Sequence, residues 1–305
     1  MQIELESANG NNRKKIIIII VLTVLTIIVL SLLGIYAANM YNIKYISKQK
    51  RKNGIINSTN QLKQNFNTNQ IINTEIKEQK EKIKLPQYTE EAKNKMKNIY
   101  NTEKKIAYLT FDDGPSKAVT PLILDLLKKE NIKATFFVLG SNVNANKDIL
   151  VREYNEGHYI ANHGYSHQYS KIYKSEQEVL NEYNKTEKSI QSALGIDEYS
   201  SHLFRFPGGS TGGKYSKLKS KAKQTLHEND ISFIDWNCLT KDAEGIQTKE
   251  SIIENLKKTS DGKSSLVILM HDAETKILTY ETLQDVINYL REQGYEFDNF
   301  YSIMK

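Results

Sequence analysis

The stretch Ile106-Ala107-Tyr108-Leu109-Thr110-Phe111-Asp112-Asp113-Gly114 decides the fold that we expect for this chain. It is a short apolar run that ends in two adjacent carboxylates and a glycine. Such runs are typical of strands buried on both faces of a parallel sheet. In parallel α/β folds the carboxyl ends of the strands form the functional edge. Asp112 and Asp113 are therefore expected to lie at a site.

Beyond this stretch, short apolar runs alternate with longer amphipathic ones up to the C-terminus. Strands are expected at 106–109, 134–139, near Phe206, at 231–236, at 266–270 and near Phe300. Helices are expected at 119–129, 147–156, 176–194, 217–228, 249–258 and 278–292. This many strand–helix repeats predicts a (β/α) barrel, and an open doubly wound sheet is the alternative. Residues 104–305 are expected to form this domain.

The N-terminal part of the chain has a different composition. Residues 16–38 form an apolar run that follows Arg13-Lys14-Lys15. A membrane-spanning helix needs about 20 apolar residues, whereas the apolar core of a signal peptide has about 7–15. We therefore expect an uncleaved transmembrane anchor, with residues 1–15 as a cytoplasmic tail. No cysteine follows the run, which excludes a lipid-anchored lipoprotein.

Residues 39–103 are rich in Asn, Gln, Lys and isolated Ile. Isolated isoleucines bury too little apolar area to form a core, so we expect a stalk that is partly helical and partly disordered. A coiled-coil spacer is the alternative, although no heptad pattern persists.

The overall charge and the cysteine content set further limits. The chain has 42 Lys+Arg and 36 Asp+Glu, a net charge of +6, and many of the lysines fall in the stalk. Basic and aromatic residues are not interleaved as in nucleic-acid-binding proteins, so no nucleic-acid partner is expected. Cys238 is the single cysteine, which excludes an intramolecular disulfide.

Two histidines complete a metal-binding set with the first motif. His163 and His167 are four residues apart, and Gly164 and Ser166 between them favour a tight loop over a long helix. One carboxylate and two imidazoles can hold a divalent ion and leave a position open for water. Adjacent residues at a strand end point in different directions, so the second carboxylate remains free to act as a base.

Three further features follow predicted strands. His271 is a candidate general acid at the end of the 266–270 strand. The segment Arg205-Phe206-Pro207-Gly208-Gly209 places a guanidinium beside a glycine-rich turn, whose backbone N–H groups can approach a ligand closely. Trp236 offers an aromatic face that suits a sugar ring, and it suits a core position equally well.

In this order the motifs resemble those of the polysaccharide deacetylase family, the NodB-homology domain of carbohydrate esterase family 4. The resemblance covers about Lys104 to Lys305 and implies a distorted (β/α) barrel. It implies that Asp113, His163 and His167 bind the metal. Asp112 would be the catalytic base.

The resemblance also assigns supporting roles. Arg205 would orient the base, and His271 would be the general acid. The family uses an aspartate to tune that histidine within a Trp-x-x-x-x-x-Asp-Trp pattern, which Trp236 and Asp242 match. Asp235 imitates the end of the pattern, but the distance from the strand favours Asp242.

Three positions depart from the family pattern. Gly164 stands where Ser or Thr is usual, Gly208 replaces an aromatic residue after the proline, and Ala243 replaces the second Trp. The backbone N–H of Gly208 can still stabilise an oxyanion, but a side-chain wall is lost. A more open groove is expected.

Together these features predict a zinc-dependent deacetylase of N-acetylglucosamine in peptidoglycan, and cobalt, nickel and manganese are alternative metals. Muramic acid, poly-N-acetylglucosamine and chitin-type oligomers are alternative substrates. A non-catalytic wall-binding protein on the same fold is an alternative function. A zinc protease is a third option, but the chain lacks the His-Glu-x-x-His signature of such enzymes.

The expected location is the cell membrane, crossed once, with the catalytic domain outside. The basic residues after the apolar run, at 44–52, slightly outnumber those before it, so charge alone leans towards an inside C-terminus. We nevertheless expect the catalytic domain outside the cell, because its expected substrate lies in the envelope.

Overall fold

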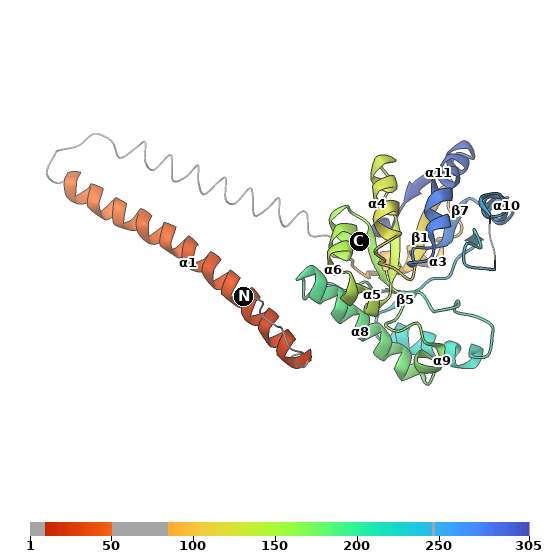
Figure 1. Ribbon diagram of the computed structural model, residues 1–305, viewed down its shortest axis with the longest axis horizontal. Helices are drawn as coiled ribbons and strands as arrows, with labels where there is room; N and C mark the ends of the chain where they lie inside the picture. The colour runs from red at the N-terminus through yellow and green to blue at the C-terminus, as the bar shows by residue number, and fades with distance from the viewer. Residues whose placement is uncertain (1–9, 51–84, 246–247, 305) are drawn as a thin grey trace, which may run out of the picture. The chain divides into compact units, whose positions relative to one another are not determined.

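The computed structural model describes residues 10–50, 85–245 and 248–304 (Figure 1). The chain divides into two units with the boundary between Ile83 and Lys84. In the first unit, helix α1 runs from Gly10 to Lys50 and contains the expected apolar run. Its segment Ile27–Lys44 is long and apolar enough to cross a membrane, with a mean hydropathy of 1.4.

The second unit is built on one sheet in which every strand pairing is parallel. Its strands are β1 Ile106–Asp112, β2 Thr135–Val138, β3 Tyr159–Asn162, β4 Leu203–Phe204, β5 Ser232–Phe233, β6 Cys238–Leu239, β7 Ser265–His271 and β8 Glu296–Asp298. The order is β5-β4-β3-β2-β1-β7-β6, with β8 beside the first half of β1. The curled parallel sheet confirms the predicted distorted barrel.

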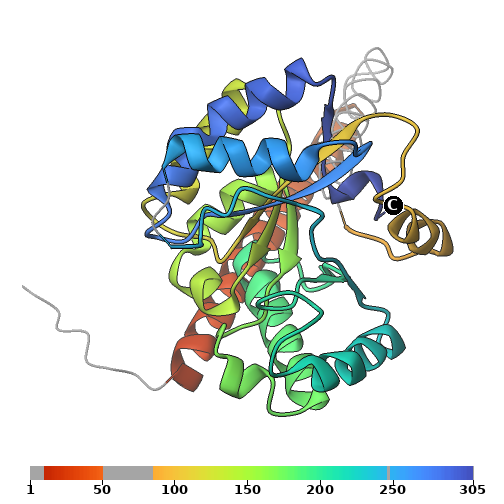
Figure 2. The ribbon, with the colours of Figure 1, turned by 90° about the vertical axis from the view of Figure 1, so that its right-hand side faces the viewer.

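Helices surround this sheet. They are α3 Glu90–Lys97, α4 Thr120–Lys129, α5 Gly140–Ala145, α6 Lys147–Asn155, α7 Tyr169–Ile172, α8 Glu176–Leu194, α9 Ser216–Glu228, α10 Lys249–Ser260 and α11 Ile277–Glu292. The pair α8 and α9 lies towards the β5 edge, and the pair α10 and α11 lies towards the β6 edge (Figure 2).

The period-two alternation along β1 separates two cores. Ala107, Leu109 and Phe111 belong to the cluster that packs under the helices. The intervening residues, including Thr110 and Asp112, face the interior of the half-barrel, where Arg205 bonds both. In β7 the same alternation turns Leu269 and His271 towards the interior pocket. Since Asp112 pairs with His271 in the β1–β7 register, two predicted site residues lie side by side.

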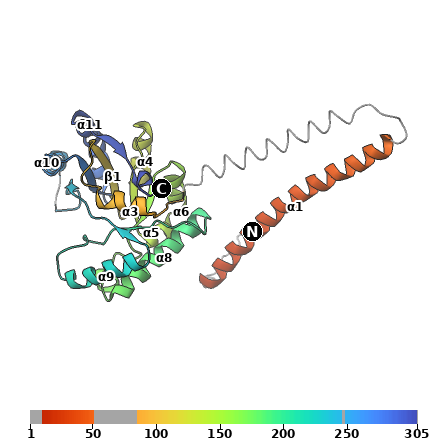
Figure 3. The ribbon, with the colours of Figure 1, turned by 180° about the vertical axis from the view of Figure 1, so that it is seen from behind.

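Residues 85–103 belong to the folded unit rather than to the linker. Helix α3 starts at the cap Thr89, whose side chain accepts a hydrogen bond from the backbone N–H of Ala92. Ala92, Met96 and Ile99 are buried against the cluster at the bottom of the half-barrel. The helix lies near the C-terminal end of the chain (Figure 3), and the N–H of Gln87 donates to Met304 O at 3.2 Å. The folded unit therefore begins near Lys84, not Lys104. Of the stalk expected at 39–103, residues 39–50 continue helix α1, and residues 51–84 lie outside the described residues.

Some expected strands differ in detail. The short terminal strand expected near Phe300 is β8, which ends two residues earlier, at Glu296–Asp298, and Phe300–Ser302 is a 3₁₀-helix capped by the Asn299 side chain. The strand at 231–236 shortens to two residues because the chain then leaves the sheet. The N–H of Ile234 still donates a hydrogen bond to the carbonyl oxygen of Phe204 in β4. Three residues later, the N–H of Asn237 donates to the carbonyl oxygen of Val267 in β7, at 3.2 Å. The segment that carries Trp236 therefore crosses the open side of the half-barrel.

Candidate active site

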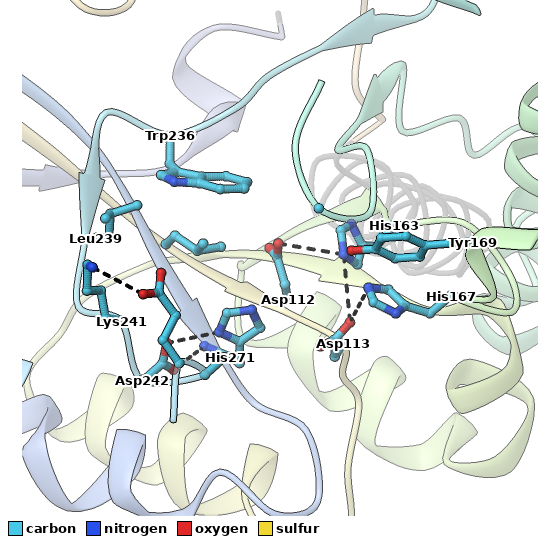
Figure 4. Close-up of a pocket in the computed structure, with 14 residues that line it drawn as sticks. Asp112, Asp113, His163, His167, Tyr169, Trp236, Leu239, Lys241, Asp242 and His271 are labelled. Carbon is cyan, nitrogen blue, oxygen red and sulfur yellow. Dashed lines mark hydrogen bonds and ion pairs between the residues drawn. The ribbon is translucent and has the colours of Figure 1, made fainter. Parts of the chain in front are cut away.

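A pocket of about 370 Å³ lies at the carboxyl ends of the strands (Figure 4). It brings together almost every site residue that the sequence predicts. Those that line it are Asp112, Asp113, His163, His167, Gly208, Trp236, Asp242 and His271. Arg205 lies beneath, fully buried, and contacts the pocket through Asp112.

The two adjacent aspartates are turned apart by the backbone. Asp112 ends β1 and continues its interior face, where it is 2% exposed. Asp113 has a φ of +75°, a left-handed conformation that aspartate tolerates better than most residues. The carboxylate of Asp113 consequently faces His163 and His167, while one oxygen of Asp112 faces His163 across the pocket (Figure 4) and the other accepts a hydrogen bond from Arg205.

The loop between β3 and α7 holds both histidines. It is a tight turn, as the glycine and serine predict, and Gly164 has a φ of +82°. Glu182 of α8 fastens the turn, because its carboxylate accepts hydrogen bonds from the N–H groups of Tyr165 and Ser166 at 2.8 and 2.7 Å. This carboxylate was not expected from the sequence, since it lies on a helix far along the chain.

The geometry of Asp113, His163 and His167 fits a divalent cation. One ligand atom from each lies within 4.8 Å of the others. Asp113 Oδ1 is 3.7 Å from His163 Nε2 and 3.5 Å from His167 Nε2, yet this buried oxygen has no hydrogen-bond partner among the described residues. A carboxylate oxygen that faces two imidazole nitrogens at these distances is satisfied by a shared cation.

The state of His163 supports the same assignment. Its Nδ1 lies 2.8 Å from the carbonyl oxygen of Arg205, which fixes the proton on Nδ1 and leaves Nε2 as a lone-pair donor. Burial lowers the pKa of His163 to about 3, so the ring is neutral at physiological pH. Neutral imidazole is the form that binds metal ions.

Arg205 connects Asp112 to the rest of the half-barrel. Its Nη1 donates to Asp112 Oδ1 and to Thr110 Oγ1, both at 2.7 Å. Burial raises the pKa of Asp112, and the charge of Arg205 opposes that rise. The bond fixes one oxygen of Asp112 and leaves Oδ2 directed at the pocket, 3.7 Å from His163 Nε2.

On the opposite wall, Asp242 holds His271. Asp242 Oδ1 lies 2.9 Å from His271 Nδ1, and Oδ2 accepts from the His271 backbone N–H and from Thr279 Oγ1, both at 2.7 Å. Burial disfavours the imidazolium, but the hydrogen bond and charge of Asp242 outweigh it and raise the pKa of His271 to about 9. His271 is therefore protonated at neutral pH. Asp235 bonds Ser210 instead, and Asp242 is the aspartate that contacts His271.

The glycine turn lies between two aromatic side chains. Gly208 and Gly209 have φ values of +70° and +77°. A Cβ on Gly208 would meet Tyr169 Oη at 2.3 Å, and one on Gly209 would meet the ring of Trp236 at 3.3 Å. Tyr169 was not expected from the sequence, although its position two residues after His167 was a usable signal.

Comparison with known proteins agrees with this geometry. The sequence model of the family described as polysaccharide deacetylase matches residues 99–227. A peptidoglycan-N-acetylglucosamine deacetylase of Bacillus cereus is 35% identical over 204 residues, which cover 65% of this chain and 70% of that protein. The peptidoglycan-N-acetylglucosamine deacetylase PgdA of Listeria monocytogenes is 39% identical over 64% of this chain, but the match spans only 38% of that longer protein.

Among solved structures, a Streptococcus mutans CE4 esterase is similar to this chain with a TM-score of 0.62 and 30% identity. The match covers 68% of this chain and 90% of the esterase.

Proposed function

The chain belongs to the polysaccharide deacetylase family, the NodB-homology proteins of carbohydrate esterase family 4, and we propose that it removes N-acetyl groups from N-acetylglucosamine in peptidoglycan. The observation that carries the proposal is the β1–β7 register. It places Asp112 beside His271, with the Asp113/His163/His167 group on the adjacent strand ends. A base, an acid and a cation-binding group thus surround one pocket.

Asp113, His163 and His167 would hold a divalent metal, with zinc our first choice. When bound, this ion would polarise the acetyl carbonyl and lower the pKa of water. The remaining chemistry belongs to the side chains. Asp112 Oδ2 takes a proton from the attacking water, and Arg205 keeps that carboxylate oriented.

Water adds to the acetyl carbon, and the N–H of Gly208 stabilises the oxygen that becomes negative. His271, already protonated, then gives its proton to the sugar nitrogen as the C–N bond breaks. The products are acetate and a free amine. The role of Asp242 is to keep His271 charged and its ring fixed.

Peptidoglycan is the proposed substrate because the curated relatives at 35% and 39% identity carry that activity in their names. Trp236, at the rim of the pocket, is proposed to stack on a sugar ring. Muramic acid and other N-acetylated glycans require the same chemistry and are alternative outcomes of the test.

We further propose that α1 anchors the protein in the cell membrane, with the catalytic domain outside and residues 39–83 as a linker. The support is the apolar segment Ile27–Lys44. The envelope substrate also requires that orientation. Protease treatment of intact cells should digest the catalytic domain, and full protection would place that domain inside.

The decisive experiment is mass spectrometry of purified glycan fragments incubated with the enzyme, with and without a chelator. We expect acetate release and loss of acetyl groups from N-acetylglucosamine, both abolished by the chelator and restored by zinc. Asp112→Asn should abolish release with normal metal content. Asp125→Asn, the same change at an exposed residue of α4, is the matched control.

Unchanged acetate release from Asp112→Asn would refute the assigned base. Absence of release from the wild type with every metal tested would instead favour a non-catalytic wall-binding protein.

A further inference from the structure

We propose that Tyr169 is a further substrate-contacting residue: its ring forms the wall that is missing at Gly208, and its hydroxyl donates a hydrogen bond to the acetyl oxygen. The inference rests on the proposed deacetylation. It adds a side-chain donor beside the backbone N–H of Gly208.

The first support is the position of Tyr169. It begins α7, directly after the histidine loop, and it lines the same pocket as Asp112, Asp113 and His163. Its hydroxyl end points into the pocket, towards the side that carries Asp112 and His163 (Figure 4). Tyr169 therefore borders the space that an acetyl group at the metal-binding residues would occupy.

The second support is the contact with Gly208. A Cβ at this position would lie 2.3 Å from Tyr169 Oη and 3.1 Å from its Cζ. The hydroxyl thus occupies the space where a side chain of residue 208 would begin. Gly208 leaves space that the side chain of Tyr169 fills. The aromatic wall of the pocket therefore comes from α7 and not from the turn.

The third support is that the ring is fixed while its hydroxyl remains available. Tyr169 packs against His167 and Tyr173, with ring centroids 5.6 Å apart in both cases. Tyr173 is itself held, because its hydroxyl donates to Pro207 O at 2.6 Å. Within residues 85–245 and 248–304, Tyr169 Oη makes no hydrogen bond to the protein, and the side chain is 40% exposed.

A fixed donor with no internal acceptor is what a ligand oxygen can use. A preorganised donor near a developing negative charge stabilises the transition state more than the ground state. The phenol of Tyr169 lies against the turn that carries the Gly208 N–H, because its Oη is 2.3 Å from where a Cβ of residue 208 would stand. Both donors would then act on the same acetyl oxygen.

The test compares Tyr169→Phe, which keeps the ring, with Tyr169→Leu, which removes the aromatic wall. Acetate release from an N-acetylglucosamine oligomer is measured under zinc saturation. Tyr169→Phe should lower kcat at least about ten-fold with KM nearly unchanged, because the lost bond forms in the transition state. Tyr169→Leu should lower kcat similarly and also raise KM.

Tyr289→Phe is the matched control, because Tyr289 lies on α11, away from the residues that line the pocket, and its hydroxyl lies 3.3 Å from Ser260 Oγ. It should retain wild-type kcat. An active wild type whose kcat is unchanged in Tyr169→Phe would overturn the inference and leave the proposed function intact. An inactive wild type would instead overturn the proposed function.

A double-mutant cycle tests the contact without relying on activity. Gly208→Ala should lower the melting temperature through both its positive φ and the clash with Tyr169 Oη. The φ cost is the same in either background, so it cancels in the cycle. Gly208→Ala should therefore cost less in the Tyr169→Phe background. Equal costs in the two backgrounds would contradict the placement of the hydroxyl.

Discussion

The two walls of the pocket each present a histidine, and their environments drive the two rings to opposite charge states. His163 is buried against a backbone carbonyl, and burial lowers its pKa to about 3. His271 is buried beside Asp242, which overcomes the burial and raises its pKa to about 9. The same residue type is thus neutral on one wall and charged on the other, which suits the proposed roles of metal ligand and acid.

The difference shows how the partner of the Nδ1 atom sets the charge state of the ring. A carbonyl oxygen fixes the tautomer of the imidazole but carries no charge. A carboxylate fixes the tautomer and also provides a negative charge. Pairs of titratable groups whose pKa values are pushed apart identify acid and base assignments in enzymes.

The largest effects should come from removing either ring, with opposite consequences for the metal. His163→Ala and His271→Ala should each lower kcat by at least about 10³-fold, since both the cation and the acid are needed. Only His163→Ala should lower the bound zinc, measured by atomic emission after dialysis.

His227→Ala, at an exposed position of α9, is the control for both variants and should keep full activity and metal. Normal zinc in His163→Ala, or loss of zinc in His271→Ala, would exchange the two walls and contradict the assignment.

The next largest effect should come from Asp242→Asn, which keeps the shape but removes the charge. In the wild type, His271 is protonated below about 9, so kcat should fall as the pH rises through that value. In the variant, only the charges of Asp112 and Asp113 oppose burial, and the pKa should fall towards the ordinary value of about 6.5. At pH 8 the variant should then lose up to about 30-fold in kcat.

The measurement is the pH profile of kcat for both proteins. The descending limb should move to lower pH, and the loss should shrink as the pH falls. A parallel loss at all pH values would mean that Asp242 only orients the ring.

The sequence predicted the chemistry of both walls better than it predicted their supports. Motif residues such as Asp112 and His271 were found because they follow apolar runs, and runs as long as β1 and β7 are unambiguous. Glu182 and Tyr169 were not found, since their roles depend on tertiary contacts that no local pattern encodes.

The same reasoning explains the fold details that the sequence did not predict. Strand β3 has four residues and runs directly into the histidine loop, so its apolar pattern is too short to read. Helix α3 was assigned to the stalk because its buried positions, Ala92 and Met96, are sparse in a polar stretch and find their core only in the folded unit.

Two buried carboxylates differ in the same way as the two histidines, because one has hydrogen-bond partners and the other has none among the described residues. This difference predicts an effect on the free energy of unfolding. Asp242 is almost fully buried, yet hydrogen bonds from His271 and Thr279 outweigh the burial, and its pKa is lowered. Glu153 of α6 is also buried, but neither oxygen has a hydrogen-bond partner among the described residues. Burial and the nearby charge of Asp272 raise the pKa of Glu153.

Folding raises the pKa of this carboxyl group. Its protonation therefore stabilises the folded state to the full extent below the unfolded pKa of about 4.3, and this contribution is lost as the pH rises through the folded pKa. Glu153→Met should therefore raise the free energy of unfolding by about 1–3 kcal/mol at pH 8, with a smaller gain near pH 4.5. Glu153→Gln, the polar control, should also flatten the pH dependence.

Urea unfolding with a chelator present, followed by the fluorescence of Trp236, the single tryptophan, measures this difference. A gain of equal size at both pH values would exclude ionisation as its source.

The smallest effect should come from Thr279→Val, which keeps the shape of the side chain and removes one donor to Asp242. Asp242 Oδ2 still accepts from the His271 backbone, so the carboxylate remains charged and bonded. One such bond contributes about 1 kcal/mol, so kcat should fall less than about ten-fold, and the descending limb of the pH profile should stay near the wild-type position. The same kcat profiles as for Asp242→Asn measure this. A descending limb displaced as far as in Asp242→Asn would show that Thr279 positions the charge of Asp242 on which the protonation of His271 depends. The charge state of His271 would then depend on Thr279 as well as on Asp242.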